Sequence, residues 1–186
     1  MNKEKAYTQI GHYLKSHFIQ YFVDEEDGVP RYTMVFKNCF NCIDKMIESC
    51  IYFYDDCMEV KTYYTQSSAD CCKNHQESIP DVICLLNYIN ATVWMNCSDG
   101  ANGKFYKSSI LYTPRLFMTE DDCYDITLTT LIPYDFYEVA PLETEDYITA
   151  YCPELLNRIY PAIYILLKGD VDLQHAKQLV DRFIRA

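Results

Sequence analysis

Apolar residues recur every three or four positions in the first segment of the chain, with polar residues such as Gln9, His12 and Lys15 between them. This spacing places the apolar side chains on one face of an α-helix. They are Ala6, Tyr7, Ile10, Tyr13, Leu14, Phe18, Tyr21 and Phe22. We expect an amphipathic helix that reaches Phe22 and ends before the acidic residues 24–28, which would form a solvated turn.

The next segments alternate between apolar and polar residues, which is the period of a β-strand. The alternation predicts strands over residues 32–37, 47–54 and 57–64. Asp55 and Asp56 lie between the last two, at the spacing of a two-residue hairpin turn. We therefore expect three consecutive strands, of which the last two form a hairpin.

The hairpin turn also fixes which residues of the two strands face each other. Phe53 would face Met58 and Ile51 would face Val60, so that one face of the pair is apolar. A slip of one residue would mix the two faces, so the pattern favours this register. The opposite face would carry Tyr52, Tyr54, Glu59, Lys61 and Tyr63.

A polar stretch over residues 66–77 predicts a loop, after which Ser78 would cap a second helix. Asn87 and Asn90 lie near the apolar stripe of that helix. We expect such amides to satisfy buried backbone groups or to cap a loop, with a functional role as the alternative. The stripe consists of Val82, Leu85, Leu86, Ile89 and Val93.

A second hairpin is expected over residues 111–118 and 125–132, with its turn at residues 121–122. Pro114 lies inside the first strand, and a proline there favours a position at the edge of the sheet. In this register one face would collect Leu111, Phe117, Ile126, Leu128 and Ile132.

The last part of the chain is predicted to be helical after an irregular segment over residues 133–142. Thr144 would cap a helix that Pro153 and Pro161 break or kink. An extra helix follows over residues 172–185. The element order α-βββ-α-ββ-α-α predicts a single α+β domain over residues 1–186, with an antiparallel sheet and helices packed on it.

Three stretches with this order resemble the YbjN-type sensory transduction regulators, a bacterial family whose fold is similar to that of type III secretion chaperones. They are residues 86–90 (Leu-Asn-Tyr-Ile-Asn), the strand pair that follows, and residues 158–163 (Arg-Ile-Tyr-Pro-Ala-Ile) running on to Gly169. The likeness covers residues 5–169. It implies binding or regulation, including a chaperone-like homodimer, and it supplies no catalytic residues. Residues 133–142 and the helix after Gly169 depart from the family pattern.

The formal net charge of −11 opposes binding to nucleic acid, because phosphate affinity comes from Lys and Arg. No apolar run approaches the roughly 20 residues of a membrane span. The N-terminal residues show no apolar signal core. We therefore expect a cytoplasmic protein that contacts neither nucleic acid nor membrane.

Ten cysteines are present. Without an export signal, we expect them to be reduced and mainly structural. The main alternative is a metal- or thiol-dependent enzyme built on Cys39, Cys42, Cys72 and His75, since short Cys and His pairs supply tetrahedral zinc ligands. A single Cys-x-x-Cys arises readily in a cysteine-rich chain, so unligated thiols and no cofactor are the favoured interpretation.

The chain contains 18 tyrosines. Tyrosine is favoured at protein interfaces, although it is also a good strand residue. Tyr52, Tyr54 and Tyr63 are therefore the candidate partner-binding residues. They predict a non-enzymatic protein-binding module, chaperone-like or regulatory, whose partner is another protein or a second copy. The competing arrangement places the last helix of the chain over these rings.

Overall fold

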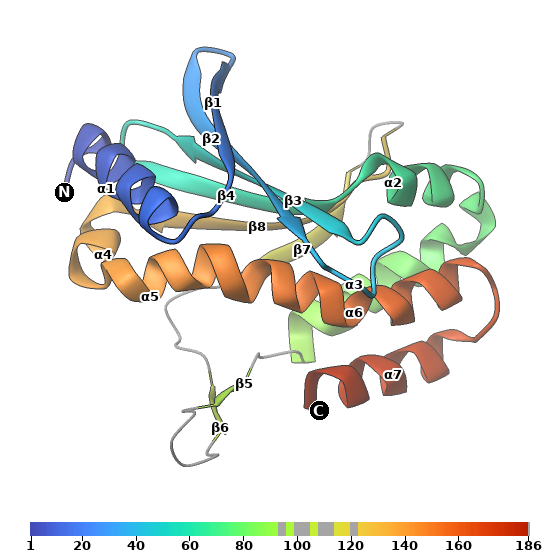
Figure 1. Ribbon diagram of the computed structural model, residues 1–186. Helices are drawn as coiled ribbons and strands as arrows, with labels where there is room; N and C mark the ends of the chain where they lie inside the picture. The colour runs from blue at the N-terminus through green and yellow to red at the C-terminus, as the bar shows by residue number, and fades with distance from the viewer. Residues whose placement is uncertain (93–95, 99–104, 108–113, 120–122, 186) are drawn as a thin grey trace.

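The computed structural model describes residues 1–92, 96–98, 105–107, 114–119 and 123–185 (Figure 1). Its centre is a six-stranded antiparallel sheet in the order β1-β2-β3-β4-β8-β7. The strands are β1 (Tyr21–Glu26), β2 (Val29–Lys37), β3 (Met46–Phe53), β4 (Cys57–Tyr64), β7 (Arg115–Met118) and β8 (Ile126–Pro133), while β5 (Asn96–Ser98) and β6 (Phe105–Lys107) form a separate pair. The predicted α+β class with an antiparallel sheet is confirmed.

The helices lie on one side of this sheet, whose face there we call the inner face, and the last of them packs on other helices (Figure 1). They are α1 (Lys3–Ser16), α2 (Gln66–Lys73), α3 (Ile79–Thr92), α4 (Tyr134–Val139), α5 (Pro141–Asp146), α6 (Cys152–Leu167) and α7 (Leu173–Arg185), with the short turns η1 (Gln76–Ser78) and η2 (Tyr147–Tyr151). No described helix is both long and apolar enough to cross a membrane.

The first helix is shorter than its apolar spacing predicts, and the residues after it form a strand. Helix α1 ends at Ser16, and the chain reverses at Phe18, whose φ is +55°. Strand β1 then pairs with β2 around Asp27 and Gly28, which both adopt left-handed backbone conformations, with φ of 52° and 78°. The extension of the helix to Phe22 was therefore wrong. An Asp-Gly pair between two strands is a strong signal for such a two-residue turn.

The register predicted for the next hairpin is confirmed. Phe53 pairs with Met58 and Ile51 with Val60, and all four side chains are buried on the inner face. Strand β4 also pairs with β8, and this pairing brings Val60 opposite Thr130.

The register predicted for the β7–β8 hairpin was wrong by one residue. Leu116, not Phe117, points inward, opposite Leu128. The Thr119 N–H donates to the Asp125 carbonyl at 2.9 Å, which fits the observed register and not the assumed one. Phe117 is exposed on the other face. Leu111 lies outside the described residues, and β7 is an edge strand, as the proline before it predicts.

Two segments predicted to be irregular are helical. Helix α2 occupies the polar stretch after β4, because its small residues Ser68, Ala69, Cys71 and Cys72 form a buried stripe. Helix α4 occupies the segment after β8. Helix α5 begins at Pro141, before the predicted cap, and α6 contains Pro161 without ending there.

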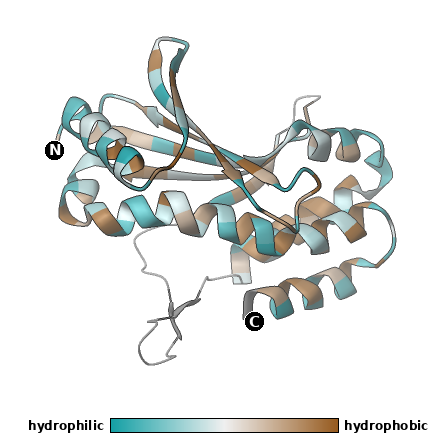
Figure 2. Cartoon of the chain, viewed as in Figure 1, coloured by the Kyte–Doolittle hydropathy of each residue, from teal (hydrophilic) through white to brown (hydrophobic). Residues whose placement is uncertain are grey.

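The buried apolar side chains form one continuous cluster between the sheet and the helices. Figure 2 shows how the apolar residues of α6 alternate with polar ones along the helix. The Tyr64 hydroxyl donates to the Leu156 carbonyl at 2.8 Å, which joins β4 to α6. The apolar periods of the sequence predict one core that contains Phe53, Val60, Leu86, Phe117, Leu128 and Ile163. Five of them belong to this cluster, and the prediction was wrong for Phe117, which is exposed.

The last helix packs away from the sheet. Helix α7 contacts α6 and α3, and its Ala176 and Val180 are fully buried there. The Tyr88 hydroxyl of α3 also donates to Asp181 at 3.0 Å. The competing arrangement, in which this helix covers the tyrosines of the first predicted hairpin, was therefore wrong.

Candidate functional site

The face of the sheet opposite the helices, which we call the outer face, carries rows of directly paired residues. One row crosses five strands through Asp24, Arg31, Tyr52, Glu59 and Leu131. Directly opposed side chains in antiparallel strands lie close enough to interact. The pairing of strands therefore brings together charges and rings that are far apart in the sequence.

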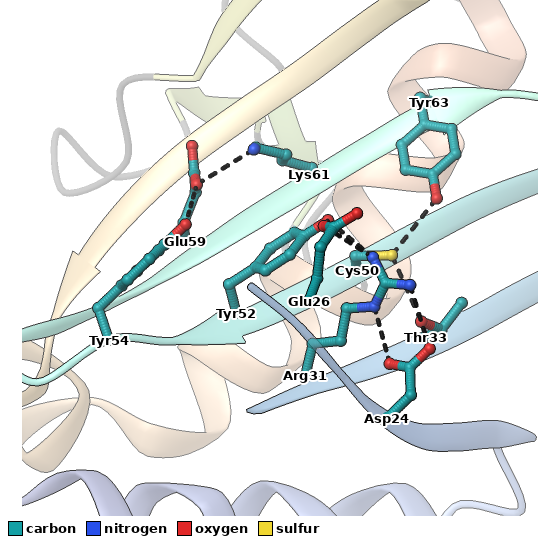
Figure 3. A network of polar contacts seen from close by, with 10 residues as sticks. All are labelled: Asp24, Glu26, Arg31, Thr33, Cys50, Tyr52, Tyr54, Glu59, Lys61 and Tyr63. Atoms are coloured by element: carbon teal, nitrogen blue, oxygen red, sulfur yellow. Dashed lines mark hydrogen bonds and ion pairs between the residues drawn. The ribbon is translucent and has the colours of Figure 1, made fainter. Parts of the chain in front are cut away.

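Arg31 is the centre of the first group of contacts in this row (Figure 3). Its guanidinium donates to both carboxylate oxygens of Asp24, at 2.7 and 3.1 Å, to Glu26 at 2.9 Å and to the Tyr52 hydroxyl at 3.1 Å. The hydrogen bond to Asp24 raises the pKa of Arg31, and the same bond lowers the pKa of Asp24. The bidentate pair with Asp24 joins β2 to β1, and the bond to Tyr52 joins β2 to β3.

Tyr52 lies beneath these charged groups. Its hydroxyl donates to Glu26 at 2.5 Å, and the Lys61 ammonium lies 4.8 Å from the centre of its ring. Burial, followed by the bond to Glu26, raises the pKa of Tyr52. The ring is therefore enclosed by a cation on its face and by hydrogen bonds at its tip.

Glu59 is the centre of the second group. It accepts a hydrogen bond from the Tyr54 hydroxyl at 3.2 Å and another from the Thr129 hydroxyl at 3.2 Å, and its carboxylate lies 3.4 Å from the Lys61 ammonium. The Tyr52 and Tyr54 rings lie nearly parallel, with centres 6.3 Å apart. These contacts extend the network across β4 to β8.

Tyr63 lies in another row of the outer face, opposite Glu48 on β3 and Thr127 on β8, and it contacts a thiol. Its hydroxyl lies 3.3 Å from the Cys50 sulfur, which is also 3.5 Å from the Thr33 hydroxyl. Burial and the neighbouring Cys50 raise the pKa of Tyr63. We call the residues drawn in Figure 3 the outer-face cluster: Asp24, Glu26, Arg31, Thr33, Cys50, Tyr52, Tyr54, Glu59, Lys61 and Tyr63.

The three predicted tyrosines thus share one face, but they differ in exposure. Tyr52 is only 8% exposed, whereas Tyr54 is 36% exposed. The apolar side chains that stand out most from this face are Leu131, at 62%, and Phe22, at 67%, with Phe117 also exposed. Sequence reasoning did not select any of them for binding. Leu131 could have been found, because it is an apolar residue out of phase with the buried positions of its strand.

The predicted cysteine pairs lie in buried positions. Cys39 and Cys42 are in the turn between β2 and β3, where the Cys42 N–H bonds the Cys39 carbonyl at 2.9 Å. Burial raises the pKa of Cys42 to about 12 and also raises that of Cys39. Burial likewise raises the pKa of Cys72 in α2 to about 12. Such thiols hold their protons at neutral pH, which opposes a role as nucleophile.

His75 does not complete a metal site with these cysteines. Its Nδ1 lies 2.8 Å from the Cys71 carbonyl oxygen and 3.9 Å from the Cys71 sulfur. The two residues line an open, shallow hollow of about 360 Å³ together with Asp70, Tyr164 and Lys168. In the part of the chain that is described, no three His, Cys, Asp or Glu side chains come together as metal ligands.

A buried carboxyl group lies at the start of the long helical segment α5–η2–α6. Glu145 is almost fully buried and accepts a hydrogen bond from the Tyr137 hydroxyl at 2.5 Å. Burial raises the pKa of Glu145, and Asp146 raises it further, against the opposing effects of Tyr137 and His17. All buried polar side-chain atoms of the described residues have a hydrogen-bond partner. Glu145 and Tyr137 are buried and bonded to each other, so we assign them to the core.

The chain was compared with protein-family models, with curated proteins and with solved structures, and none of them matches. The resemblance to the YbjN-type regulators therefore stays an expectation from the sequence.

Proposed function

We propose that this chain is a non-enzymatic protein-binding module that binds its partner through the outer face of the sheet. A chaperone-like or regulatory role follows from the resemblance to the YbjN-type regulators. The observation that carries the proposal is the pattern on the outer face, where Leu131, Phe117 and Tyr54 expose apolar area beside paired charges. An open face is ordinary for an antiparallel sheet, but exposed large apolar side chains on it are not needed for folding.

The contacts within the outer-face cluster favour recognition over proton transfer. Arg31 is engaged by two carboxylates and a hydroxyl, and Glu59 is engaged by two hydroxyls and an ammonium. A general acid or base needs a group that can reach a substrate proton. Charges that are already paired can instead hold rings in fixed positions, and rigid aromatic and apolar groups with a polar fringe are typical of protein interfaces.

The proposal is tested by placing a charge at Leu131, a strongly exposed apolar position in the middle of the face. Leu131→Asp should abolish binding of a protein that co-purifies with the wild-type chain from its native host and binds it again when both are purified. The matched control is Leu142→Asp on α5, since Leu142 is exposed to a similar degree, at 66%. Both variants should keep the wild-type melting temperature.

Binding should be measured with the purified partner by calorimetry. A loss of affinity with Leu131→Asp and none with Leu142→Asp supports the outer face as the site. Equal affinity in both variants and the wild-type chain would place the partner elsewhere.

A further inference from the structure

The two edges of the sheet differ in whether their outward backbone groups are hydrogen bonded. At the β7 edge, the side-chain amide of Asn90 donates to the Leu116 carbonyl at 2.7 Å and accepts from the Leu116 N–H at 2.9 Å. These bonds occupy the backbone groups that a further strand would need. At the other edge, β1 pairs with β2 alone among the described strands. Among the described residues, no side chain forms a hydrogen bond with the backbone of β1.

The pairing of β1 with β2 shows which backbone groups face outward. Glu26 and Val29 flank the two-residue turn and form the first hydrogen-bonded pair, so the pairs alternate from there along the ladder. Tyr21, Val23 and Glu25 therefore direct their N–H and carbonyl groups to the open side. Pro30 lies opposite Glu25, in a pair that needs no bond between these two strands.

This open edge is long and carries apolar side chains. Strand β1 has six residues, and five of them are exposed. Phe22 is 67% exposed and Val23 is 59% exposed, although they lie next to the acidic residues Asp24, Glu25 and Glu26. An edge with exposed apolar residues and unpaired backbone groups is a template for another strand, and charges restrict which strand it accepts.

We infer that β1 pairs with β1 of a second copy of this chain, antiparallel, across a two-fold axis at Val23. A two-fold axis perpendicular to the sheet keeps the outer faces of both copies on the same side. An outer-face residue of one β1 must therefore lie opposite an outer-face residue of the other, and an inner-face residue opposite an inner-face residue. The axis must therefore lie where one residue of β1 is opposite the same residue of the second copy.

Charge selects which residue lies on the axis. An axis at Asp24 or at Glu25 would place identical carboxylates opposite each other in a chain that already carries a net charge of −11. An axis at Phe22 would pair only three residues of each β1. An axis at Val23 pairs five residues of each strand, and it places Phe22 opposite the second copy's Asp24 and Tyr21 opposite its Glu25. No acid then faces an acid.

This assembly joins the two sheets into one, with both outer faces on the same side. The outer-face cluster of each copy lies beside the β1 edge, because Asp24 and Glu26 belong to both. The inference does not rest on the proposed function, since the edge and Leu131 are tested by separate substitutions.

The experiment measures the mass of the full chain in solution as a function of concentration, by sedimentation equilibrium. The wild-type chain should pass from 21.9 kDa to twice that mass. Val23→Glu should weaken the dimer at least about tenfold, because it places two carboxylates at the axis. Val139→Glu on α4 is the matched control, since Val139 is also exposed and lies away from the edge. It should leave the dimer unchanged.

A charge exchange tests the axis itself. Val23→Glu and Val23→Lys should each dimerise poorly alone, and an equimolar mixture should recover the dimer, which also shows that both variants are folded. Leu131→Asp should dimerise like the wild-type chain. The inference is overturned by a wild-type chain that stays at 21.9 kDa at every concentration. It is also overturned by a mixture that does not recover, or by Val139→Glu acting as strongly as Val23→Glu.

Discussion

Asn90 on α3 hydrogen bonds both backbone groups of Leu116 through one side-chain amide, at 2.7 and 2.9 Å. The amide imitates the backbone of a neighbouring strand, and it fastens α3 to the edge of the sheet. This role agrees with the expectation that amides near the stripe of this helix satisfy backbone groups.

Replacing Asn90 by Leu should reduce the free energy of unfolding by about 1–3 kcal/mol, because two backbone groups lose their partner. Asn90→Asp should have an intermediate effect, since a carboxylate still accepts from the N–H but donates nothing. Asn87→Leu on the exposed side of the same helix is the control and should change stability little. Urea denaturation gives all three values, and equal losses for Asn87 and Asn90 would contradict this role.

The two stacked tyrosines should respond differently to truncation. Tyr52 is 8% exposed and bonded at its tip, so Tyr52→Ser should cost about 3–5 kcal/mol, as for loss of a buried ring. Tyr54→Ser should cost much less. Melting curves of the two single variants measure this difference. Similar melting temperatures for both would show that Tyr52 is not enclosed.

The register of the β7–β8 hairpin, in which Phe117 points outward, can be tested by truncating two phenylalanines. Phe53→Ala removes a fully buried ring and should lower the free energy of unfolding by about 3–5 kcal/mol. Phe117→Ala removes an exposed ring and should lower it by less than about 1 kcal/mol. A large loss at Phe117, measured by denaturant titration, would favour the register in which Phe117 points inward.

Glu145 should make stability depend on pH. Burial raises its folded-state pKa, so the native chain retains this proton to a higher pH than the unfolded chain does. The contribution of Glu145 is therefore fully present below the unfolded pKa and is lost as the pH rises through the folded pKa. Glu145→Gln keeps an acceptor for Tyr137 and cannot ionise. Its melting temperature relative to the wild-type chain should rise with pH, in scans from about pH 4 to pH 8.

The matched control for Glu145 is Glu143→Gln on the exposed side of α5. The difference between this variant and the wild-type chain should follow no such trend. A difference for Glu145→Gln that stays constant with pH would show that the carboxyl titrates normally.

The thiols should react with a disulfide reagent according to burial. Cys84 and Cys123 are exposed and should react first in the folded chain. Cys42 and Cys72 should react slowly, because burial raises the pKa of each to about 12 and leaves little thiolate at neutral pH. In denaturant, without reductant, nearly all ten cysteines of the sequence should titrate. Several missing thiols would reveal disulfides.

The parts of the fold that the sequence predicts best are those where two independent patterns agree. For β3 and β4, strand alternation and the Asp55-Asp56 turn give the same register, and the structure has it. For β1, helical spacing competed with the Asp27-Gly28 turn signal, and Tyr21 and Phe22 fitted both periods. For β7, the turn length was assumed, and an error of one residue exchanged the two faces.

The candidate site was only partly predictable for a related reason. Alternation within one hairpin places Tyr52, Tyr54 and Tyr63 on one face. The partners of Tyr52 are Arg31 on β2 and Glu26 on β1, and both strands lie outside the hairpin that contains Tyr52. Their contribution depends on the strand order of the whole sheet, which no local period encodes.

The placement of all packed helices on the inner face gives adjacent residues of one strand different evolutionary freedom. Residues such as Ile51 and Val60 determine whether the chain folds, and exposed outer-face residues such as Leu131 determine what that face presents to a partner. Substitutions at the exposed outer-face positions can therefore alter the contact surface while the core stays intact. A lineage could acquire a new partner in this way without passing through an unstable intermediate.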